Sequence, residues 1–518
     1  MIPALLSVIV AFSIIAVSVS QVTFNNFFIV GNTIKGQQAF NIAEAGLNYY
    51  LWHLNHNNTD FKDGKTTPTT PDPTLGYGPY VHDYIDSEGV KQGTYTLWIK
   101  PSATGSTIVT VRSIGQTIDS GVKRTVEAQI GSPSFASYGL VSDEALWFGN
   151  TETADGPVHS NQGIRMDGDN TSTASSAKAT YTPPNGLGDN GSISHPGVWC
   201  HTSITSPVNC VTRSKSDWIY PVTSVDFNQV TSSLCTIKRA AFAANAATAA
   251  LATQSNACTQ VPTTRTSTYL PQRSTTYTLT RGYLIQLNTN GTYDLYNVNG
   301  ENDRLTPYTS ALTLQSVATG ITIPSAGVIY VEDNVWVRSN PTYHGRVSVA
   351  AGKLASTSSS RYANIVVADD ILYTTKNGSD AIGLIAQDSV IIAPYAPPAS
   401  GAFNFEVDAA MIAQSGEVWY PGTYRSATTR CTRGWTNSNQ TFTFYGSVAT
   451  RQVWTWTWLN GSSQCGDAAY DSSLNRYISG VNHNTTQYDY NLEYGPPPSY
   501  PLTSGYNFLS WREVLTHP

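Results

Sequence analysis

The chain opens on a stretch in which apolar residues predominate and no side chain from Met1 to Ile34 is ionisable. A run of this length is sufficient to cross a lipid bilayer as one helix. Beyond it, apolar residues recur at three- and four-residue spacing as far as Leu54, which is typical of an amphipathic helix. The two patterns together predict one continuous helix over residues 3–54, about 75–80 Å long at 1.5 Å per residue.

A secretory signal peptide would begin with basic residues and end at a small-x-small cleavage site, and neither is present. The first half of the helix has no polar face, so it must be enclosed either by lipid or by other copies of the same helix. We expect a leader ending in Gly to have been removed just before Met1. The residues expected in a filament core are Leu5, Leu6, Val8, Val10, Phe12, Ile14, Ile15 and Val17.

Residues 56–80 are rich in Pro, Thr and Gly and indicate a linker or loop. Polar and apolar residues then alternate over 93–101, 106–115 and 123–131, with turn residues between the three runs. This pattern predicts a three-stranded antiparallel meander.

After residue 133 the chain changes to short apolar runs broken by Gly, Asn and Asp. Residues 226–253 are Ala-rich and predict a helix, and Asn290-Gly291 predicts a hairpin turn. β-branched runs start at residues 328, 347, 365 and 384, with weaker ones at 411 and 442. A period near 20 residues favours a solenoid, in the form of a right-handed parallel β-helix, over a β-sandwich.

The expected fold class is therefore α+β, mainly β, in three parts. Residues 1–55 form the helix, residues 56–132 form the linker and meander, and residues 133–518 form the β-helix-like domain. A helical insert at about 226–258 interrupts the last part.

The composition favours an extracellular location. Only 12% of its 518 residues are charged, and the formal net charge of -6 lacks the basic excess of a nucleic-acid binder. Six cysteines without zinc-type spacing favour disulfides in an oxidising compartment. Six cysteines allow 15 pairings, and their grouping along the chain favours Cys200–Cys210, Cys235–Cys258 and Cys431–Cys465.

Candidate chemistry is sparse. Asp369-Asp370 is the best acidic pair, but adjacent strand residues point to opposite faces, and His159 is expected in a structural role. We therefore expect no catalytic residue, no metal and no cofactor. Trp454, Trp456 and Trp458 are expected to share one face, either buried or as a platform for sugars. Sequons for glycosylation lie at Asn57, Asn170, Asn190, Asn290, Asn377, Asn439, Asn460 and Asn484.

The segments MIPALLSVIVAFSIIAVSVS and QQAFNIAEAGLNYYLWHL resemble the N-terminal helix of type IV pilins, in particular minor pilins with the AEAGL stretch found here at residues 43–47. The resemblance implies cleavage by a prepilin peptidase and methylation of the new N-terminus, here Met1. Most pilins carry Glu at mature position five, whereas this chain has Leu5. Residues 136–518 also resemble a surface domain fused behind pilin-type helices.

This resemblance implies a subunit of an extracellular type IV pilus-like filament, held in the inner membrane before assembly. Its partners would be copies of itself, other pilins and, at the surface, host or surface glycans. Two alternatives remain open at this point. One is a low-copy tip pilin with adhesive function, which the missing carboxylate at position five favours. The other is a surface-anchored enzyme acting on polysaccharides, because parallel β-helices host such enzymes.

Overall fold

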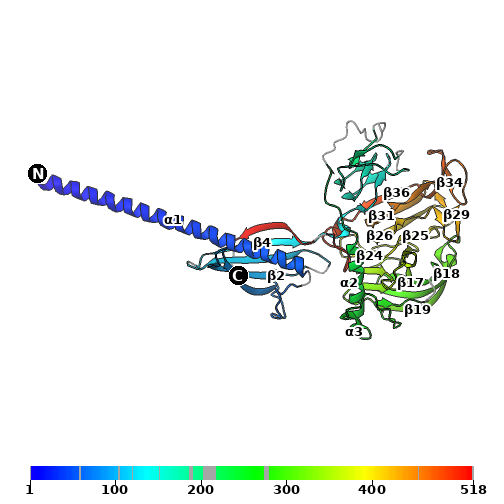
Figure 1. The fold of residues 1–518 in the computed structure, drawn as a ribbon, viewed down its shortest axis with the longest axis horizontal. Coiled ribbons are helices and arrows are strands. Elements are labelled where there is room, and N and C mark those ends of the chain that lie inside the picture. The colour runs from blue at the N-terminus through cyan, green and yellow to red at the C-terminus, as the bar shows by residue number, and fades with distance from the viewer. Residues whose placement is uncertain are drawn as a thin grey trace. The chain divides into compact units, whose positions relative to one another are not determined.

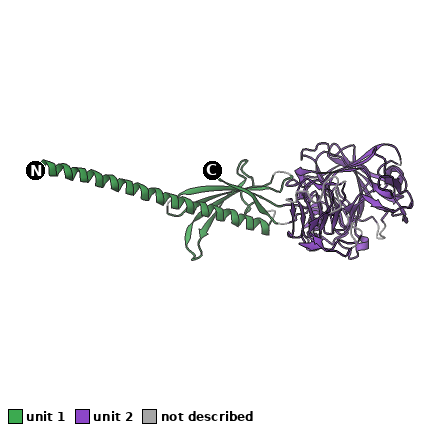
Figure 2. Ribbon diagram, turned by 90° about the horizontal axis from the view of Figure 1, so that it is seen from above, with its two compact units in different colours: residues 1–132, 505–518 green, residues 133–504 purple. Residues whose placement is uncertain are grey.

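The computed structural model has an α+β, mainly β fold made of two compact units (Figure 2). Unit 1 comprises residues 1–132 and 505–518, and unit 2 comprises residues 133–504. The structure describes residues 2–57, 60–102, 105–119, 121–150, 152–185, 191–201, 217–273, 279–398, 400–452, 454–503 and 505–515.

Unit 1 combines one helix with one antiparallel sheet (Figure 1). Helix α1 runs without interruption over Ile2–His56. The sheet has five strands in the order β1-β2-β3-β4-β37. Their bounds are Tyr77–Ile85, Lys91–Lys100, Val109–Thr117, Lys123–Gly131 and Asn507–Val514. The predicted meander is confirmed as β2, β3 and β4, while β1 begins inside the stretch expected to be a linker.

The second half of α1 packs on this sheet through small residues. A Cβ on Gly46 would lie 2.3 Å from Ser113 Oγ, and a Cβ on Gly115 would lie 2.0 Å from the Ala39 carbonyl oxygen. The backbone of the helix therefore sits directly on the sheet. Around this contact Leu47, Tyr50 and Leu54 are buried in the core of unit 1.

Unit 2 is built mainly from parallel strands. The first large sheet has the order β15-β11-β8-β5-β31-β26-β24-β22-β20-β16, with β36 also paired to β31. In chain order these strands are Leu140–Ser142 (β5), Val158–Ser160 (β8), Ala174–Ser176 (β11), Trp218–Ile219 (β15), Tyr269–Leu270 (β16), Val328–Val331 (β20), Arg346–Ala351 (β22), Ala381–Ala386 (β24), Phe403–Ala413 (β26), Gln440–Thr450 (β31) and Asn484–Tyr488 (β36).

The second large sheet has the order β19-β18-β17-β21-β23-β25-β27-β32. Its strands are Gly282–Asn288 (β17), Thr292–Glu301 (β18), Leu312–Thr322 (β19), Asn334–Asn340 (β21), Ile365–Val367 (β23), Val390–Ile392 (β25), Val418–Trp419 (β27) and Trp454–Thr455 (β32). The predicted hairpin at Asn290-Gly291 is confirmed as β17 and β18, which pair antiparallel.

Smaller sheets complete unit 2. A parallel sheet contains Leu146–Phe148 (β6), Ile164–Met166 (β9) and Val198–Trp199 (β14). Another contains Gly434–Trp435 (β30), Thr457–Leu459 (β33), Ala469–Asp471 (β34) and Arg476–Val481 (β35). Two-stranded pairs join Thr153–Ala154 (β7) to Asp169–Asn170 (β10), Thr180–Tyr181 (β12) to His195–Pro196 (β13), and Thr423–Tyr424 (β28) to Ala427–Cys431 (β29).

From β20 onward the chain passes alternately between the two large sheets, and each strand stacks parallel on an earlier one. This parallel pairing fits the predicted solenoid rather than a sandwich of antiparallel strands, and the right hand of the coil stays a prediction. The prediction that the strands recur at a constant period near 20 residues was wrong. The run at residue 365 belongs to the second sheet, and the successive partners Val328, Ser348, Gly383 and Ala410 are unevenly spaced because the connections differ in length.

The strand order of the first sheet does not follow the chain. From β5 the chain builds outward through β8 and β11 to β15, and it resumes at the opposite end with β16. The later strands then return until β31 pairs with β5. The helical insert lies between β15 and β16 in the sequence, at the point where the chain changes ends.

This insert contains α2 (Gln229–Ala243) and α3 (Ala249–Ala252). On α2, Leu234, Ile237 and Phe242 pack in one buried cluster with Tyr330 of β20 and Ile385 of β24. In Figure 1, α2 lies beside these strands. The helix therefore covers one face of the first sheet.

The expected extent of the last domain, residues 133–518, needs a correction at its C-terminal end. β37 pairs antiparallel with β4 and belongs to unit 1. The physical reason is that β4 would otherwise leave its backbone hydrogen-bonding edge open. The chain thus begins and ends in the same unit.

Candidate functional site

The apolar half of α1 is the most unusual surface of the chain. Among the described residues α1 is the single helix long and apolar enough to cross a membrane, and its most apolar stretch is not buried. Exposure of the expected filament-core residues ranges from 51% at Val10 to 71% at Phe12. The same holds for the others: Leu5, Leu6, Val8, Ile14, Ile15 and Val17 are all exposed. Met1 lies outside the described residues.

Five of the six hydroxyl groups in this segment donate hydrogen bonds to carbonyl groups of the same helix. Ser13 Oγ donates to the Ile9 carbonyl at 2.9 Å, and Ser18 Oγ donates to the Ile14 carbonyl at 2.8 Å. The hydroxyls of Ser7, Thr23 and Thr33 bond in the same way. These side chains can therefore enter an apolar environment without leaving an unpaired donor.

A shallow groove runs along this surface, lined by Pro3, Leu6, Ser7, Val10, Ala11 and Ile14. Ser7 and Ala11 are small and lie four residues apart on one side of the helix. Small residues at this spacing allow two helices to approach closely.

A second groove, of about 90 Å³, lies in unit 1 between α1 and β37. Glu44, Leu47 and Asn48 of the helix and Phe508 and Trp511 of the strand line it. Both aromatic side chains are partly exposed, Trp511 more than Phe508. The groove thus combines one carboxylate with an aromatic wall.

In unit 2 the two carboxylates of the acidic pair singled out from the sequence have different partners. Asp369 pairs with Arg338 at 3.3 Å, whereas Asp370 Oδ1 accepts the backbone N–H of Glu406 at 2.9 Å. Burial raises the pKa of Asp370 to about 6. Each carboxylate is therefore committed to a different structural partner.

His159 is buried, and its ring nitrogens lie 3.0 Å from Ser175 Oγ and 3.0 Å from Asn161 Oδ1. Burial lowers the pKa of this side chain, which favours the neutral ring. Within the described residues no group of three or more His, Cys, Asp or Glu side chains could hold a metal ion.

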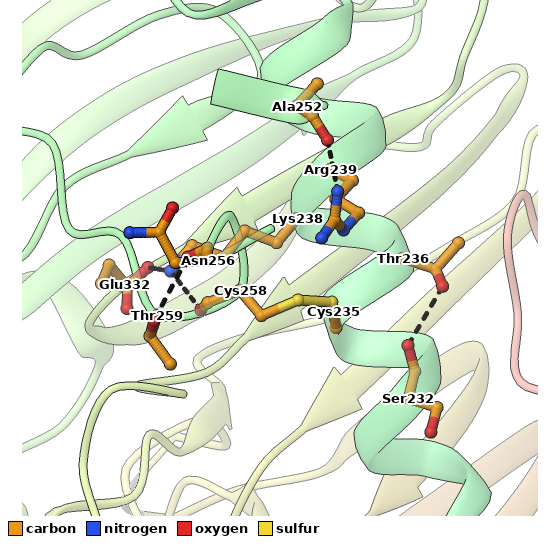
Figure 3. The surroundings of a disulfide bond; sticks show 10 residues. All are labelled: Ser232, Cys235, Thr236, Lys238, Arg239, Ala252, Asn256, Cys258, Thr259 and Glu332. Carbon is orange, nitrogen blue, oxygen red and sulfur yellow. Dashed lines mark hydrogen bonds and ion pairs between the residues drawn. A yellow bond between two sulfur atoms is a disulfide. The ribbon is translucent and has the colours of Figure 1, made fainter. Parts of the chain in front are cut away.

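A buried ion pair joins α2 to the end of β20, close to a disulfide (Figure 3). Lys238 Nζ is 2.7 Å from Glu332 Oε2, and both side chains are almost completely buried. Lys238 also donates to the Cys258 carbonyl oxygen at 3.0 Å. Burial raises the pKa of Glu332 to about 7 and lowers that of Lys238. Sequence reasoning missed this pair, because no local pattern connects the two positions.

Two of the three predicted disulfides are confirmed: Cys235–Cys258 links α2 to the end of the insert, and Cys431–Cys465 closes a second loop. The third prediction pairs Cys200 with Cys210, and Cys210 lies outside the described residues.

The sequons differ in accessibility. Asn57, Asn290, Asn377 and Asn439 are exposed, whereas Asn170, Asn460 and Asn484 are half-buried. The side-chain amides of Asn170 and Asn460 already donate to Ser172 and Ser479. Asn190 lies outside the described residues. Glycosylation of any of these sites stays a prediction.

The three tryptophans do not form an open platform. Trp456 is buried against Phe442 and Phe444, while Trp454 and Trp458 are half-buried. Trp458 Nε1 donates to the Tyr420 carbonyl at 2.8 Å. The alternative of a buried face is therefore the correct one for Trp456.

No protein-family model and no curated protein matches this chain. Among solved structures, the chain is similar to the competence-associated pilin ComZ from Thermus thermophilus at 13% sequence identity. The superposition covers 93% of this chain and 98% of that one, with a TM-score of 0.28. At that score the superposition does not establish a common fold.

Proposed function

We propose that this chain is a structural subunit of an extracellular type IV pilus-like filament. The subunit is held in the inner membrane by the first half of α1, and it polymerises with copies of itself and with other pilins through that same surface. Unit 2 is displayed outside. The observation that carries this proposal is the contrast within one helix: residues 36–54 bury one face on the sheet, whereas the apolar residues before them are exposed.

Leaving lipid for a filament core exchanges one apolar environment for another. The hydrophobic effect therefore contributes little to this step, and assembly depends on close packing between helices and on contacts between the folded units. The groove with Ser7 and Ala11 supports such packing.

The Leu5→Lys substitution tests the proposal. A lysine at this position would place an ammonium among apolar helices, and burying an unpaired charge costs several kcal/mol. We expect filaments to disappear from sheared cell-surface fractions, while the membrane-held subunit keeps its fold by limited proteolysis. The conservative Leu5→Ile substitution should assemble. Normal filament yield for Leu5→Lys would contradict the proposal.

Antibody labelling of unit 2 on intact filaments separates a repeating subunit from a tip component. The proposal predicts decoration along the whole filament. Decoration at the ends alone would instead assign the chain to the tip, where adhesion to glycans becomes the favoured role.

A further inference from the structure

Helix α1 carries only two side chains of the Lys, Arg, Asp and Glu types, namely Lys35 and Glu44. They are nine residues apart, which corresponds to about two and a half turns of an α-helix. The two charges therefore project from opposite sides of the helix, and they are separated along its axis by about 14 Å. They cannot reach each other within one copy.

Neither the Lys35 ammonium nor the Glu44 carboxylate has an ion-pair or hydrogen-bond partner among the described residues. Both side chains are half-buried. In unit 1, Arg512 pairs with Glu127 at 2.8 Å and Lys91 pairs with Asp83 at 2.7 Å, whereas the exposed Lys65 and Lys123, like Lys35 and Glu44, form no ion pair with a described residue. The two charges of the helix are thus left available for a partner outside the copy.

The groove around Glu44 suits a lysine side chain. Leu47 and Phe508 offer apolar surface to the methylene stem, while the carboxylate of Glu44 offers a counter-charge. The ring of Trp511 can attract an ammonium by a cation–π interaction.

We infer that Lys35 of one copy pairs with Glu44 of the next copy along the filament. The partner is a second copy of this chain, so the inference rests on the proposed function. Two complementary groups on opposite faces make a heterologous contact, which repeats without closing and generates an open helical array. In an array of parallel helices this pairing corresponds to an axial stagger of about 14 Å.

Reversal of the charges tests this inference. Lys35→Glu and Glu44→Lys each replace attraction by repulsion, and each should reduce filament yield about tenfold or more. The double variant K35E/E44K restores opposite charges and should recover filaments. Since neither group has a partner within the copy, all three variants should unfold like the wild-type chain when held as detergent-solubilised monomers.

Cross-linking supplies a second readout. A carbodiimide joins a carboxylate directly to an amine in contact with it, so treated filaments should yield a peptide pair that links Lys35 to Glu44. Detergent-solubilised monomers should not yield it. If wild-type filaments form and Leu5→Lys abolishes them, while both single charge variants assemble normally and the cross-link is absent, the pairing is wrong and the proposed function stands. If the wild-type chain forms no filaments, the proposed function itself fails.

Discussion

Single polar side chains at the corner between the two large sheets of unit 2 carry hydrogen bonds from one rung to the next. Asn334 Oδ1 accepts the backbone N–H of Asn364 at 2.9 Å, and Asn364 Oδ1 accepts that of Ser389 at 3.2 Å. Ser389 Oγ continues the series by accepting the N–H of Glu417 at 3.1 Å. These contacts satisfy backbone donors where the chain turns and no strand can pair with them.

The Asn364→Ala substitution should therefore destabilise unit 2. It removes the acceptor of the half-buried Ser389 N–H, and the loss of one such hydrogen bond costs about 0.5–1.5 kcal/mol. Denaturant unfolding of the detergent-solubilised chain measures the change. Asn185→Ala, at an exposed position, is the matched control and should be neutral. Equal stability of the two variants would show that this side-chain hydrogen bond at the corner contributes nothing to the stability of unit 2.

At the scale of elements, α2 is held on the first sheet by apolar packing, by the Cys235–Cys258 disulfide and by the Lys238–Glu332 ion pair. The ion pair joins the helix to the residue directly after β20. Removing one partner of a buried pair leaves the other charge uncompensated, whereas replacing both by apolar residues is often neutral.

We accordingly expect Lys238→Met to lower the free energy of unfolding by about 3–5 kcal/mol at neutral pH. The double variant Lys238→Met/Glu332→Leu should recover most of this loss. Chemical denaturation of the single and double variants measures both values. If the double variant were as unstable as Lys238→Met, the uncompensated charge of Glu332 would not be the cause of the loss, and the explanation would be wrong.

At the scale of the whole molecule, the two units should respond differently to acid. In unit 2, burial raises the pKa values of Asp370, Asp388, Asp408 and Glu417 to about 6 and that of Glu332 to about 7. In unit 1, burial opposes ionisation of Glu127, but hydrogen bonds from Arg512 and Arg112 outweigh it and lower the pKa.

A carboxyl group with a raised pKa binds a proton in the folded state before it does so in the unfolded chain, whose carboxyls titrate near pH ~4. Stability of unit 2 should therefore rise as the pH falls from about 7 to about 5. Burial also raises the pKa of Glu152, Glu301 and Asp369. The lowered pKa of His159 opposes the gain in stability below about pH 6.5, but it is one group against eight carboxyls. Unit 1 should lose stability only below about pH 4.5.

Calorimetry of the full chain in detergent at pH 7.5 and pH 5.0 tests this difference between the two units in their response to acid. The transition of unit 2 should move to higher temperature at pH 5.0, and that of unit 1 should stay in place. A transition of unit 2 that falls in acid would contradict the assigned pKa directions.

The local patterns of the sequence were sufficient to predict α1, the strands β2, β3 and β4, the β17–β18 hairpin and two of the disulfides. Each depends on residues close together in the chain, so periodicity and turn chemistry specify it. The apolar half of the helix, which is the candidate site, was predicted for the same reason.

The tertiary structure decided what depends on distant pairing. Nothing local to residues 507–514 indicates that they complete the sheet of unit 1. The order of the first large sheet, the unequal rungs and the Lys238–Glu332 pair likewise bring together residues far apart in sequence. The sequence by itself determined where α1, the meander and the hairpin lie, and that the first half of α1 carries no charge. Only the tertiary structure decided which edges meet, because strand pairing and burial are settled by the partners available once the chain has folded.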